Sequence, residues 1–343
     1  MTGLNGIAMA RKVTMAELAR AANVDVSTVS RALSDSPLVK PETKAHVKSV
    51  AEDMGYQINV AARNLRRQTT QTLGIVVPID PARGQTISDP FYLEMVGAIS
   101  NAAAKRDYDL LLTIPQSDEK VAENRLLRSG KVDGLIVIGQ AGRAERLNAL
   151  ASNTDRVVVW GGQLEDARYT IVGSDNIEGG KAAVRHLLAS GRKRVLFIGD
   201  TDLPEVALRY RGLTEAYEEK RLKHDKKLVL PLSFGAVNAI RDVADFIRSG
   251  AKFDAVFAAS DVLAIAAIHA IKGEGLSVPE DISVIGYDNV GQAAFAAPAL
   301  TTVDQNIALG GELLVDLLVK KIRGEKVTSR LTPTDLIIRK STI

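Results

Sequence analysis

The chain has 343 residues, of which 46% are hydrophobic and 25% charged, and it contains no cysteine. This length predicts about two or three domains of roughly 100 to 200 residues each. The lack of cysteine excludes disulfides, thiolate zinc sites and a cysteine nucleophile, and makes the cytoplasm the expected compartment. No apolar run approaches the roughly 18 residues of a membrane span, and the N-terminus lacks the apolar core of a signal peptide, so we expect no membrane partner.

Charge is distributed unevenly along the chain. Residues 1 to 70 hold ten Lys and Arg against six Asp and Glu, which leaves 34 and 35 for the remainder. The formal net charge of +3 therefore combines a basic head with a nearly neutral body. A basic head is the electrostatic footprint expected of a nucleic-acid partner.

Two short helices joined by a tight turn are predicted near the N-terminus. Thr14 stands at an N-cap position with Glu17 three residues later, as in a capping box, and Leu18 begins an apolar face. A second helix is predicted from about Val26 to Leu33, with Val29 on its apolar face. This pattern is typical of a helix-turn-helix, whose second helix would place its polar side in a major groove.

A third helix and a short basic segment complete the head. Pro41 suits a first helical position, and Gly55 ends the helix that follows it. Asn59 is a candidate N-cap for a helix too short to be stable in water, which we expect to fold only on DNA or against a dimer partner. The alternative for this segment is a charged flexible linker.

From Leu73 onward, short β-rich runs alternate with helical segments. Continuous apolar strands separated by helices indicate parallel sheets covered on both faces. The pattern restarts after Gly179 and Gly180, which predicts two similar α/β subdomains with a cleft between them. The predicted strands are LGIVV, DLLLTI, DGLIVIG, RVVVW, TIVGSD, RVLFIGD, KLVLPL, DAVFAAS and ISVIGYD.

Residues just beyond these strands are the candidates for ligand contact. Doubly wound sheets bind ligands outside the carboxyl ends of their strands. Asp288, Asp261 and Trp160 occupy such positions, and Phe91 and Tyr92 open the first helix of the body. The alternative for each aspartate is a helix cap with no ligand role.

The first part of the chain resembles a known family. VTMAELARAANVDVSTVSRALSDSPLVKPETKAHVKSVAEDMGY followed by NVAARNLR is similar to the headpiece and hinge of the lactose-repressor (LacI/GalR) family of bacterial transcription regulators. The resemblance extends to Ile338. It implies a helix-turn-helix headpiece plus two doubly wound α/β subdomains of the type 1 periplasmic-binding-protein kind.

The resemblance also implies domain boundaries. We expect a disordered extension over 1–10, the DNA-binding headpiece over 11–57, and a hinge helix and linker over 58–71. The effector-binding and dimerisation domain would then span 72–343. Within it, the N-subdomain would take about 72–173 and 304–325, and the C-subdomain about 174–303 and 326–343.

DNA-contacting roles follow from the same resemblance. The residues expected to read base edges are Val26, Ser27 and Arg31, and a bidentate arginine contact to guanine contributes roughly 1 to 3 kcal/mol of discrimination. Those expected to bind phosphates are Thr14, Thr28 and Ser30. The hinge residues expected in the minor groove are Asn59, Ala62 and Leu65, with the leucine wedged between base steps. The chain departs from the family at Ile58, where proline is common.

Effector-contacting roles are implied for residues of both subdomains. Arg and Asp suit sugar hydroxyls or purine edges, and aromatic side chains can stack on a ring. The expected effector-binding residues are Asp89, Phe91, Tyr92, Trp160, Arg209, Phe234, Asp261 and Asp288. Two departures from the family leave the ligand open: Ser260 and Asp261 replace a frequent Asn-Asp, and Trp160 stands where an aspartate is frequent. Trp160 either stacks on a pyranose face, which we favour, or fills the subdomain junction.

Taken together, these patterns predict a repressor whose affinity for operator DNA depends on a small-molecule effector, with a sugar expected and a purine as the alternative. The chain has none of the further leucine heptads that build tetramers, so we expect a homodimer on a palindromic double-stranded operator. A solute-binding protein and a sugar-modifying enzyme are the rival classes. We expect no enzyme activity, metal or cofactor, since the four histidines lack metal-ligand spacing and no G-x-S-x-G or P-loop occurs.

Overall fold

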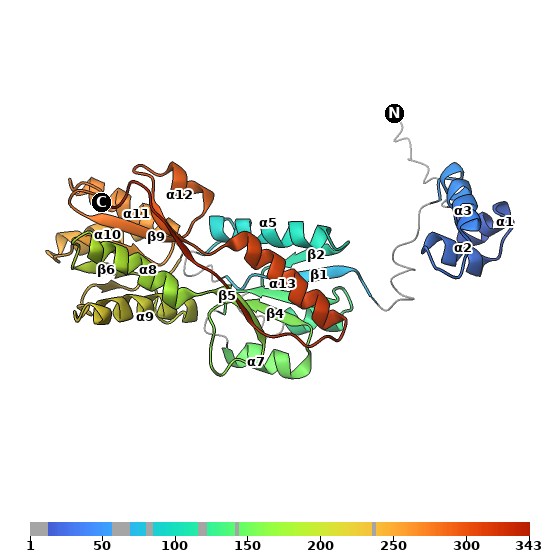
Figure 1. The fold of residues 1–343 in the computed structure, drawn as a ribbon, viewed down its shortest axis with the longest axis horizontal. Helices are drawn as coiled ribbons and strands as arrows, with labels where there is room; N and C mark the ends of the chain where they lie inside the picture. The colour runs from blue at the N-terminus through green and yellow to red at the C-terminus, as the bar shows by residue number, and fades with distance from the viewer. Residues whose placement is uncertain (1–12, 57–68, 80–84, 116–121, 141–143, 235–237) are drawn as a thin grey trace, which may run out of the picture. The chain divides into compact units, whose positions relative to one another are not determined.

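The computed structural model of the chain describes residues 13–56, 69–79, 85–115, 122–140, 144–234 and 238–343 (Figure 1). The chain divides into two compact units, Met1–Gln68 and Thr69–Ile343. The extension at 1–10 and the predicted hinge residues Asn59, Ala62 and Leu65 lie outside the described residues.

Residues 13–56, the described part of the first unit, form a bundle of three helices. Thr14 caps the first of them: its Oγ1 accepts from the backbone N of Glu17 at 3.2 Å, and Glu17 Oε2 accepts from the backbone N of Thr14 at 2.8 Å. The capping box is therefore present as predicted. Gly55 follows the third helix with φ +60°, a conformation that glycine adopts without strain. The helices are α1 (Met15–Ala21), α2 (Val26–Leu33) and α3 (Pro41–Asp53).

Small apolar side chains make up the core of this unit. The fully buried ones are Leu18, Ala19, Ala22, Val29, Ala32, Val47 and Ala51. None of them is aromatic and four are alanines, so little apolar area is withdrawn from water. The unit is consequently of low intrinsic stability, as expected for a small domain.

The second unit contains two six-stranded sheets, each of which defines one lobe. The first sheet has the order β11-β5-β4-β3-β1-β2 and is parallel throughout. Its strands are β1 (Thr72–Val76), β2 (Asp109–Thr113), β3 (Gly134–Ile138), β4 (Val157–Trp160), β5 (Thr170–Ser174) and β11 (Arg330–Thr332). The second sheet has the order β12-β10-β9-β8-β6-β7, with only β12 antiparallel. Its strands are β6 (Val195–Ile198), β7 (Val229–Leu230), β8 (Ala255–Ala258), β9 (Ser283–Asp288), β10 (Thr301–Asp304) and β12 (Asp335–Ile337).

Helices cover both faces of each sheet, so successive residues of a strand enter different cores. Ile75 packs with α5 and α13, while the next residue, Val76, packs with α6 and α7. This accounts for the continuous apolar runs in the sequence. The helices of the first lobe are α5 (Pro90–Ala104), α6 (Ala122–Arg128), α7 (Ala144–Asn153) and α13 (Ile307–Ile322). Those of the second lobe are α8 (Asn176–Ala189), α9 (Pro204–Glu219), α10 (Ala239–Arg248), α11 (Asp261–Gly273) and α12 (Gly291–Phe295).

The chain passes between the lobes three times, and the last passage differs from the sequence prediction. The first two passages follow β5 and β10, close to the segments expected. We expected the chain to have entered the second lobe by residue 326. Instead, β11 pairs with β5 in the first lobe, and the chain enters the second lobe only between Thr332 and Asp335. The strands β11 and β12 are only three residues long, so the pattern of apolar and polar residues in the sequence does not show which sheet each strand joins.

Candidate functional site

The strands of the two lobes end at one pocket, which we call the interlobe pocket. About 550 Å³ of space between its walls holds no atoms, a volume that includes open solvent, and the part that can hold the centre of a water molecule measures about 50 Å³. Its first-lobe lining consists of Asp89, Phe91, Tyr92, Gly139, Trp160, Gly161 and Ser174. Its second-lobe lining consists of Asn176, Glu205, Arg209, Phe234, Ser260 and Asp288, and Gln305 lies on the second passage between the lobes.

Asp89 positions the aromatic wall of the first lobe. Its carboxylate accepts from the backbone N of Phe91 at 3.0 Å and thereby caps α5. Phe91 and Tyr92 then face the pocket with their ring centroids 5.6 Å apart in an edge-to-face arrangement. Burial, with the negative charge of Glu205 next in effect, raises the pKa of the Tyr92 phenol. Tyr92 is therefore a neutral phenol at physiological pH.

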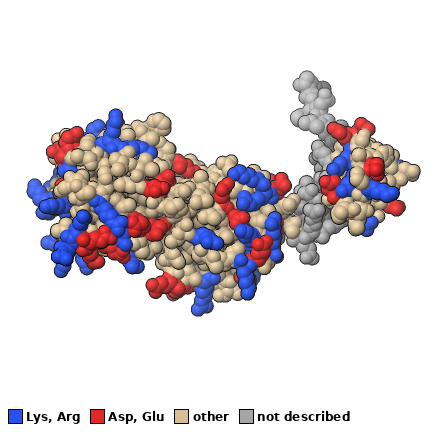
Figure 2. All heavy atoms as spheres, in the orientation of Figure 1, with Lys and Arg blue, Asp and Glu red and all other residues tan. Residues whose placement is uncertain are grey.

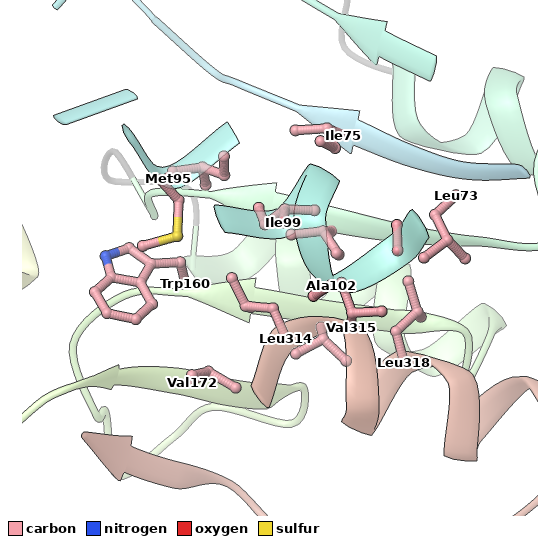
Figure 3. Packing of buried hydrophobic residues seen from close by; sticks show 14 of the residues in the cluster. Leu73, Ile75, Met95, Ile99, Ala102, Trp160, Val172, Leu314, Val315 and Leu318 are labelled. Carbon is pink, nitrogen blue, oxygen red and sulfur yellow. The ribbon is translucent and has the colours of Figure 1, made fainter. Parts of the chain in front are cut away.

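Trp160 lies mainly in the core rather than in the pocket. Only 5% of its surface is exposed, and its ring packs against Gly310 of α13, where a Cβ would overlap it. Figure 3 shows the indole beside Met95 at one end of the apolar cluster of the first lobe. One edge of the ring still lines the pocket, 6.4 Å from the centroid of Phe91. This placement favours the alternative that Trp160 fills the lobe junction.

Arg209 is a buried cation held by oxygens from three segments. Its Nε donates to Asn176 Oδ1 at 2.8 Å, its Nη1 donates to the carbonyl oxygen of Ala259, and its Nη2 donates to Gln305 Oε1 at 3.3 Å. The guanidinium also lies 3.8 Å from the ring centroid of Tyr287. Because three of its five N–H groups are engaged, the side chain is fixed before any ligand binds.

Asp288 ends β9 in an unusual backbone conformation. Its φ is +118°, which L-residues rarely adopt and which is often found at functional sites. One carboxylate oxygen accepts from Gln305 Nε2 and lies 4.0 Å from Nη1 of Arg209. Burial raises the pKa of Asp288 well above its usual range, and the charge of Arg209 offsets part of this effect. Gln305 also accepts from Ser174 Oγ at 2.7 Å, so one amide joins both lobes.

Close packing of α8 against α9 sets the position of Arg209. A Cβ on Gly212 would overlap the carbonyl oxygen of Ile177, and one on Gly180 would overlap the carbonyl oxygen of Arg209 itself. Only glycine allows the helices this approach. This packing explains why the residue three positions after Arg209, Gly212, is a glycine.

We expect Gly212→Ala to lower the thermal stability of the protein. An added methyl group in a packed interface costs about 1 to 3 kcal/mol, and here it also displaces the turn that carries Arg209. Circular dichroism melting measures the loss. Gly273→Ala is the matched control, because no atom lies within 4 Å of a Cβ at that helical position and alanine is the better helix former. A Gly212→Ala melting temperature equal to that of the wild type would contradict this packing.

Asp261 does not line the interlobe pocket, contrary to the sequence prediction. It is fully buried, with Oδ1 accepting from Thr302 Oγ1 and Oδ2 accepting from the backbone N of Val290 at 2.9 Å. Burial raises its pKa to about 7, while these hydrogen bonds lower it. The carboxylate joins the start of α11 to the ends of β9 and β10. The neighbouring Ser260, which caps α11 through its hydroxyl, is the residue that lines the pocket.

Apart from Gly139, Gly161 and Ser260, four lining residues are missing from the predicted set: Ser174, Asn176, Glu205 and Gln305. Three of them lie on the two passages between the lobes, the segments SDNIEGG and TTVDQN. Segments that cross between lobes necessarily run along the edge of the cleft, and this signal could have identified them. Glu205 follows Pro204 in the first turn of α9 and has no comparable signal.

The first unit presents the predicted base-reading side chains to solvent. Val29 and Ala32 face its core, which leaves Val26, Ser27 and Arg31 exposed on the other side of α2. Thr28 and Ser30 are partly exposed. Thr14 is exposed, but its hydroxyl is engaged in the cap of α1. Basic and acidic side chains are interspersed on the face of this unit seen in Figure 2.

None of the helices in the described ranges is long and apolar enough to cross a membrane. Within those ranges, no group of three or more His, Asp or Glu side chains is arranged to hold a metal ion.

Two family models match the chain. Bacterial regulatory proteins of the lacI family match residues 14–59, and a periplasmic binding protein-like domain matches residues 184–342. The chain is 30% identical over 339 residues to the HTH-type transcriptional repressor PurR of Haemophilus influenzae (strain PittEE), covering 96% of this chain and 98% of the relative. It is 30% identical over 340 residues to the HTH-type transcriptional regulator CelR of Thermobifida fusca, with 96% and 98% covered.

Solved structures give the same result for the fold. The Lac repressor dimer bound to operator and an anti-inducer superposes with a TM-score of 0.84 at 23% identity, covering 97% of this chain and 100% of the other. A complex of the regulator CelR with cellobiose superposes with a TM-score of 0.71 at 28% identity, covering 96% of this chain and 100% of the other.

Proposed function

The chain belongs to the lacI family of bacterial regulatory proteins, and on that premise we propose that a sugar bound in the interlobe pocket controls its affinity for operator DNA. DNA binding and transcriptional regulation are the shared activity of these relatives, which are regulators and not enzymes. The proposal concerns what is specific to this chain, namely its effector, its contacts and its assembly. A regulator that acts on bacterial DNA works in the cytoplasm, which is the compartment proposed here.

The composition of the pocket wall supports a sugar. Ser174, Asn176, Asp288 and Gln305 offer donors and acceptors from both lobes, and hydroxyl groups can pair with either kind. Phe91, Tyr92 and Phe234 add apolar ring surface. The relative CelR was crystallised with cellobiose, a sugar, in a fold of the same kind. A purine base is the second candidate, because a flat ring also stacks on aromatic side chains.

Ligand binding can influence DNA through the arrangement of the lobes. The pocket is formed by both lobes, so a ligand that contacts both binds best at one separation of them. It shifts the equilibrium between arrangements by its difference in affinity for each. The segment 58–71 joins this unit to the headpiece, and Asn59, Ala62 and Leu65 are the residues proposed to fold into the minor groove of DNA.

The side chains proposed to contact DNA bases are ones that the headpiece exposes to solvent. Val26, Ser27 and Arg31 share the exposed side of α2 and are proposed to read base edges in the major groove. The proposed phosphate contacts are Thr14, Thr28 and Ser30. The Thr14 oxygen can keep accepting from the backbone N of Glu17, but its hydroxyl proton, which donates to Glu17 Oε2 at 2.9 Å, has to turn to the phosphate oxygen for this contact.

A homodimer is the proposed assembly, and two exposed apolar side chains support it. Leu93 on α5 is 55% exposed, and Phe295 at the end of α12 is 90% exposed. Both helices lie on the same side of the second unit in Figure 1 and are joined by a hydrogen bond from the backbone N of Gly291 to Glu94 Oε1 at 2.8 Å. Exposed apolar side chains that gather on one face commonly mark a protein interface.

We expect the double variant Leu93→Ser, Phe295→Ser to dissociate the dimer at concentrations where the wild type is dimeric. Central apolar anchors carry much of an interface's binding energy, so the dissociation constant should rise on the order of tenfold or more. Sedimentation velocity gives the measurement. Leu222→Ser, at an exposed leucine just after α9, is the control. If the double variant sediments as a dimer with the wild-type dissociation constant, this surface is not the interface.

The effector class is tested by isothermal titration calorimetry of the full chain. Neutral mono- and disaccharides, cellobiose among them, are compared with adenine, guanine and hypoxanthine. Saturable binding of a sugar that Asp288→Asn weakens supports the proposal. Saturable binding of a base alone, with the same sensitivity to Asp288, would establish the purine alternative.

A further inference from the structure

Glu205 is the one lining carboxylate with a fully buried oxygen that has no hydrogen-bond partner among the described residues. Its Oε2 is buried and accepts no hydrogen bond from any described residue. Burial raises the pKa of Glu205, and its own backbone N–H and the charge of Arg209 offset this only in part. A buried acceptor without a donor costs free energy, commonly about 1 to 3 kcal/mol. The cleft position of this oxygen implies that a bound molecule supplies the missing donor.

The local fold holds Glu205 at the junction of the lobes. Pro204 begins α9, and its N-cap residue, Leu203, has no side-chain acceptor. A Cβ added to Gly162 of the first lobe would lie 3.3 Å from the backbone N of Glu205 and 2.8 Å from Leu208 Cδ1, so the first lobe packs closely against the start of α9. Glu205 therefore faces the pocket from a fixed helix start instead of a mobile loop.

The charges of the pocket lining are unbalanced toward acid. Three carboxylates line it, those of Asp89, Glu205 and Asp288, against the single guanidinium of Arg209. Arg209 already donates to three protein oxygens and lies 4.0 Å from Asp288. No second cation is among the lining residues, all of which are described, so a phosphate or carboxylate on a ligand would find no free cation to pair with, and burying such a charge unpaired costs free energy.

We infer that Glu205 is a specificity-determining residue that accepts a hydrogen bond from a hydroxyl of an uncharged sugar, and that the pocket excludes phosphorylated and carboxylated sugars. This inference rests on the proposed function and narrows its ligand class. A hydroxyl donates to a carboxylate and accepts from a carboxylic acid, so it satisfies Glu205 in either protonation state. An ammonium group satisfies only the ionised state.

The exclusion of phosphorylated and carboxylated sugars is tested by titrating the full chain with matched sugars that differ in charge. Glucose is compared with glucose 6-phosphate, glucuronate and glucosamine, and cellobiose with cellobiose 6-phosphate. We expect the neutral member of a set to bind, with the anionic members weaker by at least about tenfold, which corresponds to about 1.4 kcal/mol. An anionic member that binds as tightly as its neutral counterpart would overturn the exclusion, and glucosamine as the tightest ligand would overturn the choice of an uncharged sugar.

Glu205→Gln tests the carboxylate itself, because glutamine has nearly the same size and shape as glutamate but carries an amide in its place. We expect the affinity for the neutral sugar to fall about tenfold and the discrimination against its phosphorylated counterpart to shrink. Glu218→Gln, an exposed position on the same helix, is the matched control and should change neither value. Unchanged affinity and unchanged discrimination in Glu205→Gln would show that the carboxylate does not select the ligand.

A melting experiment without ligand tests the unpartnered carboxylate independently of any sugar. The titratable groups that face Glu205 are Arg209 on its own helix, Tyr92 from α5 and Tyr169 before β5. Because the folded-state pKa is raised, Glu205 destabilises the fold increasingly as pH rises from its ordinary pKa through the raised one. Glu205→Gln removes that effect, so its melting temperature should exceed the wild-type value at pH 8 and approach it at pH 4.

The two kinds of failure are distinguishable. A Glu205→Gln protein that melts below the wild type at pH 8 would contradict an unpartnered buried carboxylate, whatever binds in the pocket. A second outcome is that no sugar of any charge binds the wild type, while Glu205→Gln melts above the wild type at pH 8 and close to it at pH 4. In that case the unpartnered buried carboxylate is supported and the proposal of a sugar effector is wrong.

Discussion

Arg209→Ala is expected to abolish the response to effector while leaving operator binding intact. The substitution removes the only cation among the lining residues of the interlobe pocket, together with the hydrogen bonds that it donates to Asn176 Oδ1 and Gln305 Oε1. It also removes the positive charge that lies 4.0 Å from the Asp288 carboxylate. A hydrogen bond to a charged group contributes about 1.5 to 3 kcal/mol, so loss of the guanidinium should lower the affinity for the effector about 10- to 150-fold. The headpiece belongs to the other compact unit and keeps its own fold. Calorimetry of the effector and fluorescence anisotropy of labelled DNA measure the two activities.

Arg211→Ala is the matched control for this experiment. It lies two residues away on α9, exposed and paired with Glu215 at 2.7 Å, and such surface pairs contribute little. We expect wild-type effector affinity from it. If the operator affinity of Arg209→Ala changes at the same sugar concentration as that of the wild type, the interlobe pocket is not the effector site. A melting curve of each variant shows whether the second unit is still folded.

Arg31→Ala is expected to remove operator selectivity more than it removes nonspecific binding. The side chain is exposed on the recognition side of α2, where a bidentate contact to guanine contributes about 1 to 3 kcal/mol. Operator affinity should therefore fall about 5- to 150-fold. Loss of one positive charge also weakens binding to random DNA, though much less. Titrations of operator and random duplexes at one fixed salt concentration give both values.

Arg20→Ala controls for charge alone. It removes the same charge from the last turn of α1 in the same unit, where the arginine is exposed and its Nε donates only to a backbone carbonyl oxygen. Its effect should be equal on both duplexes, because phosphate contacts carry no sequence information. Equal losses on both duplexes for Arg31→Ala would refute a base-reading role.

Local patterns were sufficient to predict most of the fold. The apolar spacing around Val29 predicted the bounds of α2, and the Thr14 and Glu17 pair predicted the cap of α1. Each of the nine predicted runs overlaps a strand of the structure. These features depend on residues close together in sequence, where helix periodicity and capping chemistry act directly.

The sequence did not predict which candidate residues line the pocket, because this depends on contacts between residues far apart in the chain. Asp261 and Asp288 both stand beyond buried strands, and only the folded contacts show that the first is tied to Thr302 and Val290 while the second lines the pocket. Trp160 follows an apolar strand like a ligand-facing aromatic, yet Gly310, 150 residues later in the sequence, provides the surface that buries it. The role inferred for Glu205 depends on the lack of a hydrogen-bond donor near its Oε2 among the described residues, and no sequence pattern predicts such a lack.

The central claim is that a sugar in the interlobe pocket controls operator affinity. The direct measurement is the dissociation constant of the full chain for a palindrome enriched from a random DNA pool, with and without a saturating sugar found by calorimetry. Couplings between sites are commonly about 5- to 150-fold, and we predict a change in this range that Arg209→Ala abolishes. The direction of the change distinguishes induction from corepression. An operator dissociation constant that does not change while the sugar occupies the pocket would contradict the claim.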